Sequence, residues 1–228
     1  MLLRPHCILC GFQTPNRLAL CAGCKADLPW IESGCLTCGL PLPAGAQQFQ
    51  CGECLTGSSP FTLAVTPLFY QKPVDRIITS FKHRRGLAHG HLLAQLLTDE
   101  IRDHYIDAEL PEVIIPVPLH WQRLMWRGYN QSAELGNQLG KALGIPCHTH
   151  FLKRIRPTPS QQGLSRKQRL LNLKGAFQIK QKIPFLRIAL LDDVVTTGTT
   201  AMEIACFLRA NGVKEVHLWA VARTASAT

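Results

Sequence analysis

The 228-residue sequence lacks any apolar run long enough to cross a bilayer. Its first residues also lack a basic region followed by a long apolar stretch, so no secretory signal peptide is predicted. The phosphate-binding pattern GxxxxGK(S/T) is absent as well, which argues against a P-loop ATPase. We therefore expect a cytoplasmic protein without membrane insertion.

Acidic side chains are missing from one long interval. The 57 residues from Leu135 to Leu191 contain no Asp or Glu but eleven Lys or Arg, whereas the rest of the chain has 14 basic and 15 acidic residues. The net charge of +10 therefore comes from this interval. It predicts a basic surface, within residues 141–187, for a phosphorylated ligand or for nucleic acid such as single-stranded DNA. A merely solvated surface is the alternative.

Cysteine, by contrast, is abundant, and eight of the ten cysteines form four C-x-x-C pairs near the amino terminus. The pairs are Cys7/Cys10, Cys21/Cys24, Cys35/Cys38 and Cys51/Cys54, separated by ten, ten and twelve residues. In a reducing compartment such pairs indicate metal rather than disulfides. Two pairs complete a Cys₄ site for structural Zn²⁺, so we expect one or two zinc ions. The simplest assignment joins the first pair to the second and the third to the fourth, and a crossed assignment and a redox role stay open.

The Cys-rich residues 1–58 are predicted to form a first unit, a double zinc ribbon, because they contain few other large apolar residues to build a core. Gly57–Pro60 has the composition of a linker, and residues 61–228 form the second unit. Their hydrophobic periodicity predicts strands at 62–70, 112–117, 147–152, 171–179, 188–191 and 213–221. It predicts helices at 74–82, 87–106 and 201–210, and a further helix that follows Gly128 and ends at about residue 143. This alternation indicates an α/β fold.

One stretch joins an apolar strand to two acids and a loop of hydroxyl groups. After the strand come Asp192, Asp193, Val194, Val195, Thr196, Thr197, Gly198, Thr199 and Thr200. Ligands of open α/β sheets bind where such strands end. Backbone N–H groups and hydroxyls at a helix amino terminus suit a phosphate, and paired carboxylates suit sugar hydroxyls or waters on a cation. The alternative is a generic turn in which Asp193 and Thr199 serve as turn and cap residues.

Two other segments carry cations that could meet a bound anion. Arg123 and Arg127 stand four residues apart, so they share a side of a helical turn, and Gly128 follows them. Arg166, Lys167 and Arg169 lie in a long polar segment of the kind that often forms an active-site lid, although a solvated helix is the alternative. Trp121 precedes Arg123 by two residues, and Trp126 lies between the two arginines. Both tryptophans are expected in the core or at a domain contact.

The stretch from Ile188 to Thr200 resembles the PRPP-binding motif of the type I phosphoribosyltransferases. The whole chain resembles the ComF family, including its GntX members, in its cysteine ribbons and in the motifs V-P-V-P-L-H, R-G-Y-N-Q, Q-Q-G-L-S-R-x-x-R and L-L-D-D-V-V-T-T-G-T-T, in that order. The resemblance implies a type I phosphoribosyltransferase fold, a Rossmann-like and mainly parallel sheet, behind a double zinc ribbon. It also implies a role in natural competence or the use of external DNA, with partners in the DNA-uptake machinery.

The resemblance further implies individual roles. Asp192 and Asp193 would hold the ribose hydroxyls of PRPP, and the loop from Thr196 to Thr200 its 5′-phosphate. Arg123, Arg127 and Gly128 would meet pyrophosphate, with Mg²⁺ bridging pyrophosphate and ribose oxygens. The catalytic lid would contain Arg166, Lys167 and Arg169. Only five residues follow Arg223, so no carboxyl-terminal hood for reading a base is expected, and no acceptor can be named. A phosphoribosyltransferase, a DNA-binding accessory protein and a PRPP-sensing regulator are the three hypotheses.

Overall fold

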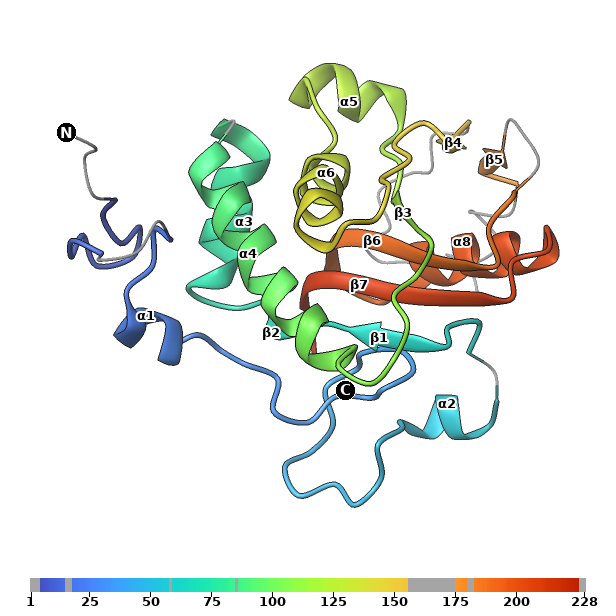
Figure 1. Cartoon of the computed structure of the whole chain (residues 1–228), viewed down its shortest axis with the longest axis horizontal. Coiled ribbons are helices and arrows are strands. Elements are labelled where there is room, and N and C mark those ends of the chain that lie inside the picture. The colour runs from blue at the N-terminus through green and yellow to red at the C-terminus, as the bar shows by residue number, and fades with distance from the viewer. Residues whose placement is uncertain are drawn as a thin grey trace.

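The protein is built around a parallel five-stranded sheet with the order β1-β7-β6-β3, in which β2 also pairs with β7 (Figure 1). The computed structural model describes residues 5–14, 18–57, 59–84, 86–155, 175–179 and 183–225. The strands are β1 (Leu63–Val65), β2 (Leu68–Phe69), β3 (Val113–Pro116), β6 (Arg187–Val195) and β7 (Glu215–Arg223). The α/β class with a mainly parallel sheet is therefore confirmed.

Helices cover both faces of the sheet. Three of them, α3 (Val74–Arg84), α4 (Leu87–His104) and α6 (Gln131–Leu143), pack on one face, and α8 (Thr199–Ala210) packs on the other (Figure 1). Alternate residues of β6 enter the two cores: Ala189 and Leu191 join the first, whereas Ile188 and Leu190 join the second. This double burial explains the unbroken apolar run in the sequence, since both faces of a parallel strand are covered.

Strand β6 is longer than the sequence predicts. The sequence pattern ends it at Leu191, but its ladder with β7 continues through Asp192 opposite Ala220 to Val195 opposite Arg223. The neighbouring β7 is itself nine residues long, so it offers backbone partners to the acidic part of β6. As a result the two acids are fixed by a sheet ladder rather than carried on a free loop.

A small second sheet replaces the strand expected at 147–152. Cys147 makes a single parallel bridge to Ile114, and β4 (Leu152–Arg154) then pairs antiparallel with β5 (Phe177–Ile179). The backbone of 146–148 nevertheless covers the open edge of β3, because Ile114 donates to Pro146 O and His148 donates to Ile114 O, both at 2.9 Å.

The Cys-rich unit is docked along the opposite edge of the sheet. It contains two short helices, α1 (Ala22–Ala26) and α2 (Gly52–Leu55). Its backbone follows the outer edge of β1 and β2: Ala64 donates to Leu36 O at 2.7 Å, and Phe69 donates to Pro29 O at 2.8 Å. Leu28 of this unit belongs to the same buried cluster as the residues of α4. Within the described residues, no helix is both long and apolar enough to span a membrane.

Candidate functional site

The eight paired cysteines form two compact thiol clusters. One contains Cys7, Cys10, Cys21 and Cys24, the other Cys35, Cys38, Cys51 and Cys54, and the Sγ atoms of each lie within 4.8 Å of one another. The structure thus joins the first C-x-x-C pair to the second and the third to the fourth, which is the simpler of the two assignments. Sulfur-only sets of four suit Zn²⁺ in a closed, structural site. Burial opposes ionisation of Cys7, but N–H groups of Cys21, Cys10 and Leu9 lower its pKa to about 6, whereas the neighbouring thiol of Cys21 raises the pKa of Cys24.

A buried arginine shows that the second cluster fits a metal. Arg223, the last residue of β7, is only 6% exposed, and its Nε and Nη1 atoms find no hydrogen-bond partner among the described residues. It lines a cavity together with Cys38 and Cys54. Buried cationic N–H groups are costly without an acceptor or a counter-charge. A metal held by four thiolates has a formal charge of −2 and would supply one.

The predicted acid pair lies at the carboxyl end of β6, between two helices on the same face of the sheet. Asp193 is 7% exposed and forms an ion pair with Lys82 near the end of α3, with 2.8 Å between Oδ2 and Nζ. Ser132, in the first turn of α6, donates its hydroxyl to Asp192 Oδ1 at 3.1 Å. The Lys82 side chain therefore neutralises a buried carboxylate at this strand end.

The two carboxylates have different electrostatic environments. Burial and the neighbouring charge of Asp193 raise the pKa of Asp192 to about 7, and the charge of Lys82 only partly opposes this. A carboxyl group with a strongly raised pKa at a sheet edge is typical of a functional site. Such a group is ready to exchange a proton, or to bind a cation or a hydroxyl group that stabilises its ionised form.

The loop after the acids leads directly into α8. Gly198 adopts the left-handed conformation, φ 72°, and precedes the first helical residue, Thr199. The hydroxyls of Thr197 and Thr199 lie 2.9 Å apart, and Thr196 and Thr197 are exposed. In this fully described segment no side chain caps the helix, and its first turn contains no acid. The N–H groups at the amino terminus of α8 are therefore open to an external anion.

The predicted arginine pair lies on a short helix, α5 (Trp121–Arg127), that follows β3. Gly128 ends the helix in the left-handed conformation, φ 80°. Arg127 donates to Gln131 Oε1 at 3.2 Å, which brings it next to the start of α6 and thus near Ser132. Arg123 is exposed.

The tryptophans of α5 contradict the expectation of a buried position. Trp121 is 56% exposed and Trp126 is 72% exposed. The reason is that α5 extends beyond the end of the sheet, where no described layer covers it (Figure 1). Met125, between them, is also exposed. The apolar side chains of α5 therefore form a surface rather than a core.

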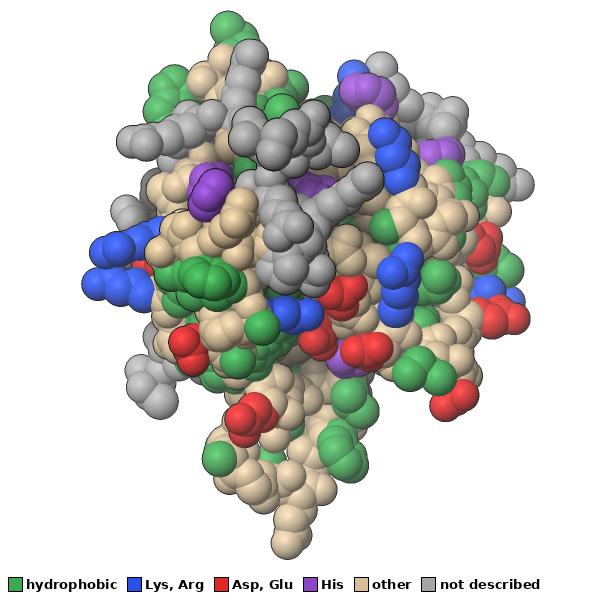
Figure 2. All heavy atoms as spheres, turned by 60° about the vertical axis from the view of Figure 1, so that its left-hand side comes forward, with side chains coloured by type: hydrophobic (Ala, Val, Ile, Leu, Met, Phe, Trp, Pro, Cys, Tyr) green, Lys and Arg blue, Asp and Glu red, His purple; other side chains and the backbone are tan. Residues whose placement is uncertain are grey.

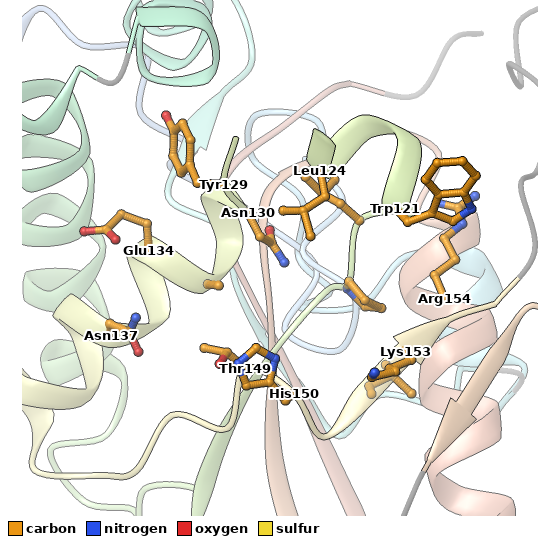
Figure 3. A pocket seen from close by; sticks show the side chains of 14 residues that line it. Trp121, Leu124, Tyr129, Asn130, Glu134, Asn137, Thr149, His150, Lys153 and Arg154 are labelled. Atoms are coloured by element: carbon orange, nitrogen blue, oxygen red, sulfur yellow. The ribbon is translucent and has the colours of Figure 1, made fainter. Parts of the chain in front are cut away.

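A pocket of about 450 Å³ lies beside α5. Trp121 and Leu124 form one wall, Asn130 and Glu134 of α6 a second, and Lys153 and Arg154 of β4 a third (Figure 3). Burial lowers the pKa of Arg154; the charge of Arg123 acts in the same direction, and that of Asp192 opposes it. Arg154 thus lies within electrostatic reach of both α5 and the acid pair. Sequence reasoning counted it only as part of a basic run.

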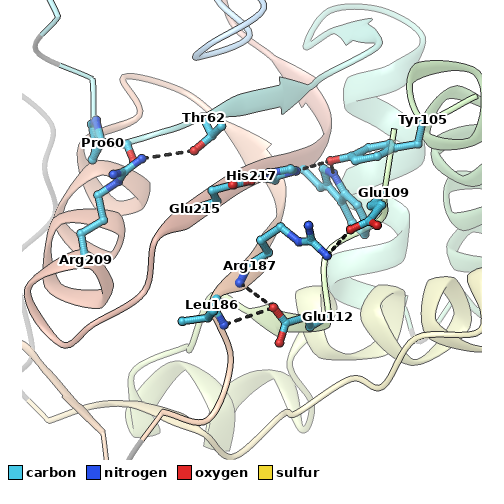
Figure 4. Close-up of polar contacts among 11 residues, drawn as sticks. Pro60, Thr62, Tyr105, Glu109, Glu112, Leu186, Arg187, Arg209, Glu215 and His217 are labelled. Atoms are coloured by element: carbon cyan, nitrogen blue, oxygen red, sulfur yellow. Dashed lines mark hydrogen bonds and ion pairs between the residues drawn. The ribbon is translucent and has the colours of Figure 1, made fainter. Parts of the chain in front are cut away.

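The rest of the basic interval does not converge on this site within the described residues. Arg187 stands at the amino end of β6, whereas Asp193 lies near its carboxyl end. Arg187 pairs with Glu109 at 2.6 Å (Figure 4). On the face in Figure 2, Lys and Arg side chains stand in separate groups with acids between them. The proposed lid residues Arg166, Lys167 and Arg169 lie outside the described residues.

These features define a class of protein: a mainly parallel α/β domain with an acid pair and an uncapped loop at one strand end, joined to two Cys₄ ribbons. The family model named double zinc ribbon domain matches residues 1–55. Competence protein F of Haemophilus influenzae is 40% identical over 226 residues, covering 96% of both chains. The DNA utilization protein YhgH of Salmonella typhi is 35% identical over 222 residues, again covering 96% of each. The chain therefore belongs to the ComF family, whose relatives are named for competence and DNA utilization.

Among solved structures, a purine phosphoribosyltransferase from Pyrococcus horikoshii Ot3 is a structural neighbour. The match covers 58% of this chain and 80% of the neighbour's chain, with 20% identity and a TM-score of 0.33. Similarity at that level carries no argument about the ligand of this chain, so the case for a ligand depends on the site itself.

Proposed function

We propose that the protein binds PRPP and Mg²⁺ at the carboxyl end of β6 and acts as a phosphoribosyltransferase-like protein in the use of DNA. The supporting observation is the combination of the Asp192–Asp193 pair, fixed by the sheet ladder, with the uncapped loop that starts α8. Eight thiols that must stay reduced to hold zinc are consistent with the cytoplasm as its place of action.

The chain's own residues divide the work of binding. The loop from Thr196 to Thr200 would hold the 5′-phosphate through N–H groups and hydroxyls. The carboxylates of Asp192 and Asp193 would accept hydrogen bonds from the two ribose hydroxyls, and Lys82 forms an ion pair with Asp193. Arg123 and Arg127 would contact the pyrophosphate.

Catalysis in such a site would depend mainly on positioning and electrostatics. Mg²⁺ held near Asp192 and Asp193 would make pyrophosphate a better leaving group. Arg154, within reach of both Arg123 and Asp192, would add positive charge on the pyrophosphate side. The acceptor of the ribosyl group stays open.

The test is titration calorimetry of the zinc-loaded protein with PRPP, with and without Mg²⁺. We expect Mg²⁺-dependent binding that is lost in Asp192→Asn/Asp193→Asn, whereas Asp103→Asn, an exposed change on α4, binds as the wild type does. Absence of PRPP binding by the wild type refutes the proposal. Pyrophosphate release, assayed with bases, nucleosides and DNA as acceptors, then separates a transferase from a PRPP-sensing regulator, which binds without turnover.

A second function, binding of single-stranded DNA, is favoured by the surface of α5. Exposed Trp121 and Trp126 alternate with Arg123 and Arg127, and Arg154 lies across the adjoining pocket. Single-stranded nucleic acids bind through aromatic stacking combined with a positive groove. The basic interval 141–187 contributes Lys153 and Arg154 to this surface, and seven of its eleven cations lie outside the described residues. Direct contact with the DNA-uptake machinery remains a proposal from family membership alone.

Fluorescence anisotropy with a labelled oligonucleotide at several salt concentrations tests this function. We expect the affinity to fall as salt rises, because phosphate contacts release counterions. Trp126→Ala should weaken binding, by roughly 1 to 3 kcal/mol if a base stacks there. Affinity that is insensitive to both salt and Trp126→Ala would show that α5 is not the binding surface.

A further inference from the structure

The carboxyl-terminal end of β7 places one arginine between the second Cys₄ cluster and the loop that starts α8. Arg223 pairs with Val195 in the ladder, and Thr224 N–H donates to Val195 O at 3.1 Å, just before Thr196. Its cavity, of about 50 Å³, is lined by Cys38 and Cys54 of the cluster and by Thr197 and Gly198 of the loop. Such a volume has room for a few waters but not for a ligand the size of PRPP.

The guanidinium group lies close to Gly198, which lines the same cavity. A Cβ atom on Gly198 would be 3.6 Å from both Nη1 and Nη2 of Arg223, which is contact distance. Gly198 is also the residue whose left-handed φ turns the chain from the loop into α8. The position of the Arg223 side chain therefore affects where the loop's N–H groups point.

The guanidinium group also lies near the thiols, because Cys38 and Cys54 line the same cavity. Burial lowers the pKa of Arg223, whereas the charges of Cys38, Cys51, Cys35 and Cys54 oppose this shift. The cluster and the loop thus share a single buried cation, with two N–H-bearing atoms that have no partner among the described residues. A shared group of this kind joins two binding sites energetically, because a change at either site alters its placement.

We propose that Arg223 couples the second Cys₄ site to the phosphate loop, so that zinc bound there strengthens binding of a phosphorylated sugar and the sugar strengthens binding of zinc. The inference depends on the proposed function, since it assumes that the loop binds a phosphate. Arg223 acts here as a positioning residue: the thiolate–zinc anion fixes its side chain, and the side chain supports Gly198.

The direct test measures zinc affinity of the full-length wild-type protein by competition with a chromophoric chelator, with and without saturating ribose 5-phosphate. We expect one of the two zinc equivalents to bind more tightly when the sugar phosphate is present, and the other to be unaffected. Reciprocally, calorimetry should show weaker ribose 5-phosphate binding when the second Cys₄ site lacks zinc.

Variants locate the coupling. Arg223→Met should abolish the effect of ribose 5-phosphate on zinc affinity and weaken zinc binding at one site by roughly 10- to 100-fold, as expected when a residue supporting metal ligands is lost. Arg223→Lys should retain part of the effect of ribose 5-phosphate on zinc affinity, because lysine keeps the positive charge but lacks the planar guanidinium group. The matched control is Arg209→Met, on the same sheet face but at the far end of α8, where Arg209 contacts Thr62 (Figure 4). It should leave the coupling intact.

The outcomes separate the two proposals. A wild-type protein that binds neither ribose 5-phosphate nor PRPP overturns the proposed function and this coupling with it. Sugar-phosphate binding with both zinc affinities unchanged overturns the coupling alone. The wild-type measurement stands even if Arg223→Met fails to fold.

Discussion

Replacing Asp192 by Asn should stabilise the fold while it removes ligand binding. Burial and the charge of Asp193 raise the pKa of Asp192 from 3.8 to about 7. A carboxyl group with a higher pKa in the folded than in the unfolded chain disfavours folding once it is ionised in both states. At about 1.4 kcal/mol per pKa unit, a shift of about three units sets an upper limit of about 4 kcal/mol. Because the side chain is only partly buried, we expect a gain of about 2 to 4 kcal/mol at pH 8.

The gain should depend on pH in a defined direction. The protonated carboxyl of folded Asp192 contributes stability that is fully present below about pH 4 and is lost as pH rises through about 7. The unfolding free energy of the wild type therefore drops relative to that of the Asn variant as pH rises through this window. At pH 5 the difference in unfolding free energy should be no more than about 2 kcal/mol. The amide of the Asp192→Asn variant would keep an oxygen for the Ser132 hydroxyl, so the change removes charge with little loss of hydrogen bonding.

Urea unfolding of the zinc-loaded protein at pH 5, 6 and 8, followed by the fluorescence of the buried Trp219, measures this difference. Asp103→Asn, on the exposed side of α4, is the control and should change stability by less than about 0.5 kcal/mol at any pH. An Asn variant that is no more stable than the wild type at pH 8, or whose advantage is larger at pH 5 than at pH 8, refutes the electrostatic argument. Calorimetry on the same sample should show that PRPP binding is lost.

Three other changes should have distinct effects. Lys82→Met leaves Asp193 buried without its counter-ion and should lower the unfolding free energy by about 3 kcal/mol. Urea unfolding at pH 8 measures this loss, and an unchanged unfolding midpoint would mean that the ion pair contributes nothing to stability. Gly39 has a left-handed φ of 69°, and the Cβ of Gly39→Ala would clash with the Thr66 side chain, so this change should detach the second ribbon from β1 and lower the zinc content from two equivalents toward one, as measured by metal analysis. Trp126→Ala should leave stability within about 0.5 kcal/mol, because the side chain is 72% exposed, and a larger loss would show that its packing matters more than its exposure indicates.

The parts of the site that are continuous in sequence could be predicted from it. The apolar run before Asp192, the hydroxyl-rich loop and the following helix form one local unit, so residue order alone indicates a strand, a loop and a helix start. The thiol assignment was predictable for a similar reason: C-x-x-C knuckles with short gaps favour neighbouring pairs. Both inferences depend on contacts between residues close in the chain.

The residues that sequence reasoning missed are brought in by the sheet topology. Arg154 of β4 and Arg223 of β7 come near the acid pair or the loop only after the strands assemble. No local pattern distinguishes them from other cations. The exposure of Trp126 was missed because composition favours burial of tryptophan, and only the fold shows that α5 extends beyond the layers that cover the sheet.

The docked ribbon also protects the sheet. Along β1 and β2, hydrogen bonds from Ala64 to Leu36 and from Phe69 to Pro29 occupy an edge that would otherwise present free backbone groups. Open edges of this kind template pairing between chains. Since the ribbon depends on metal for its folding, a chain made during zinc shortage would expose that edge before any ligand site is formed. Metal supply would then govern the aggregation of newly made chains, independently of what the strand ends bind.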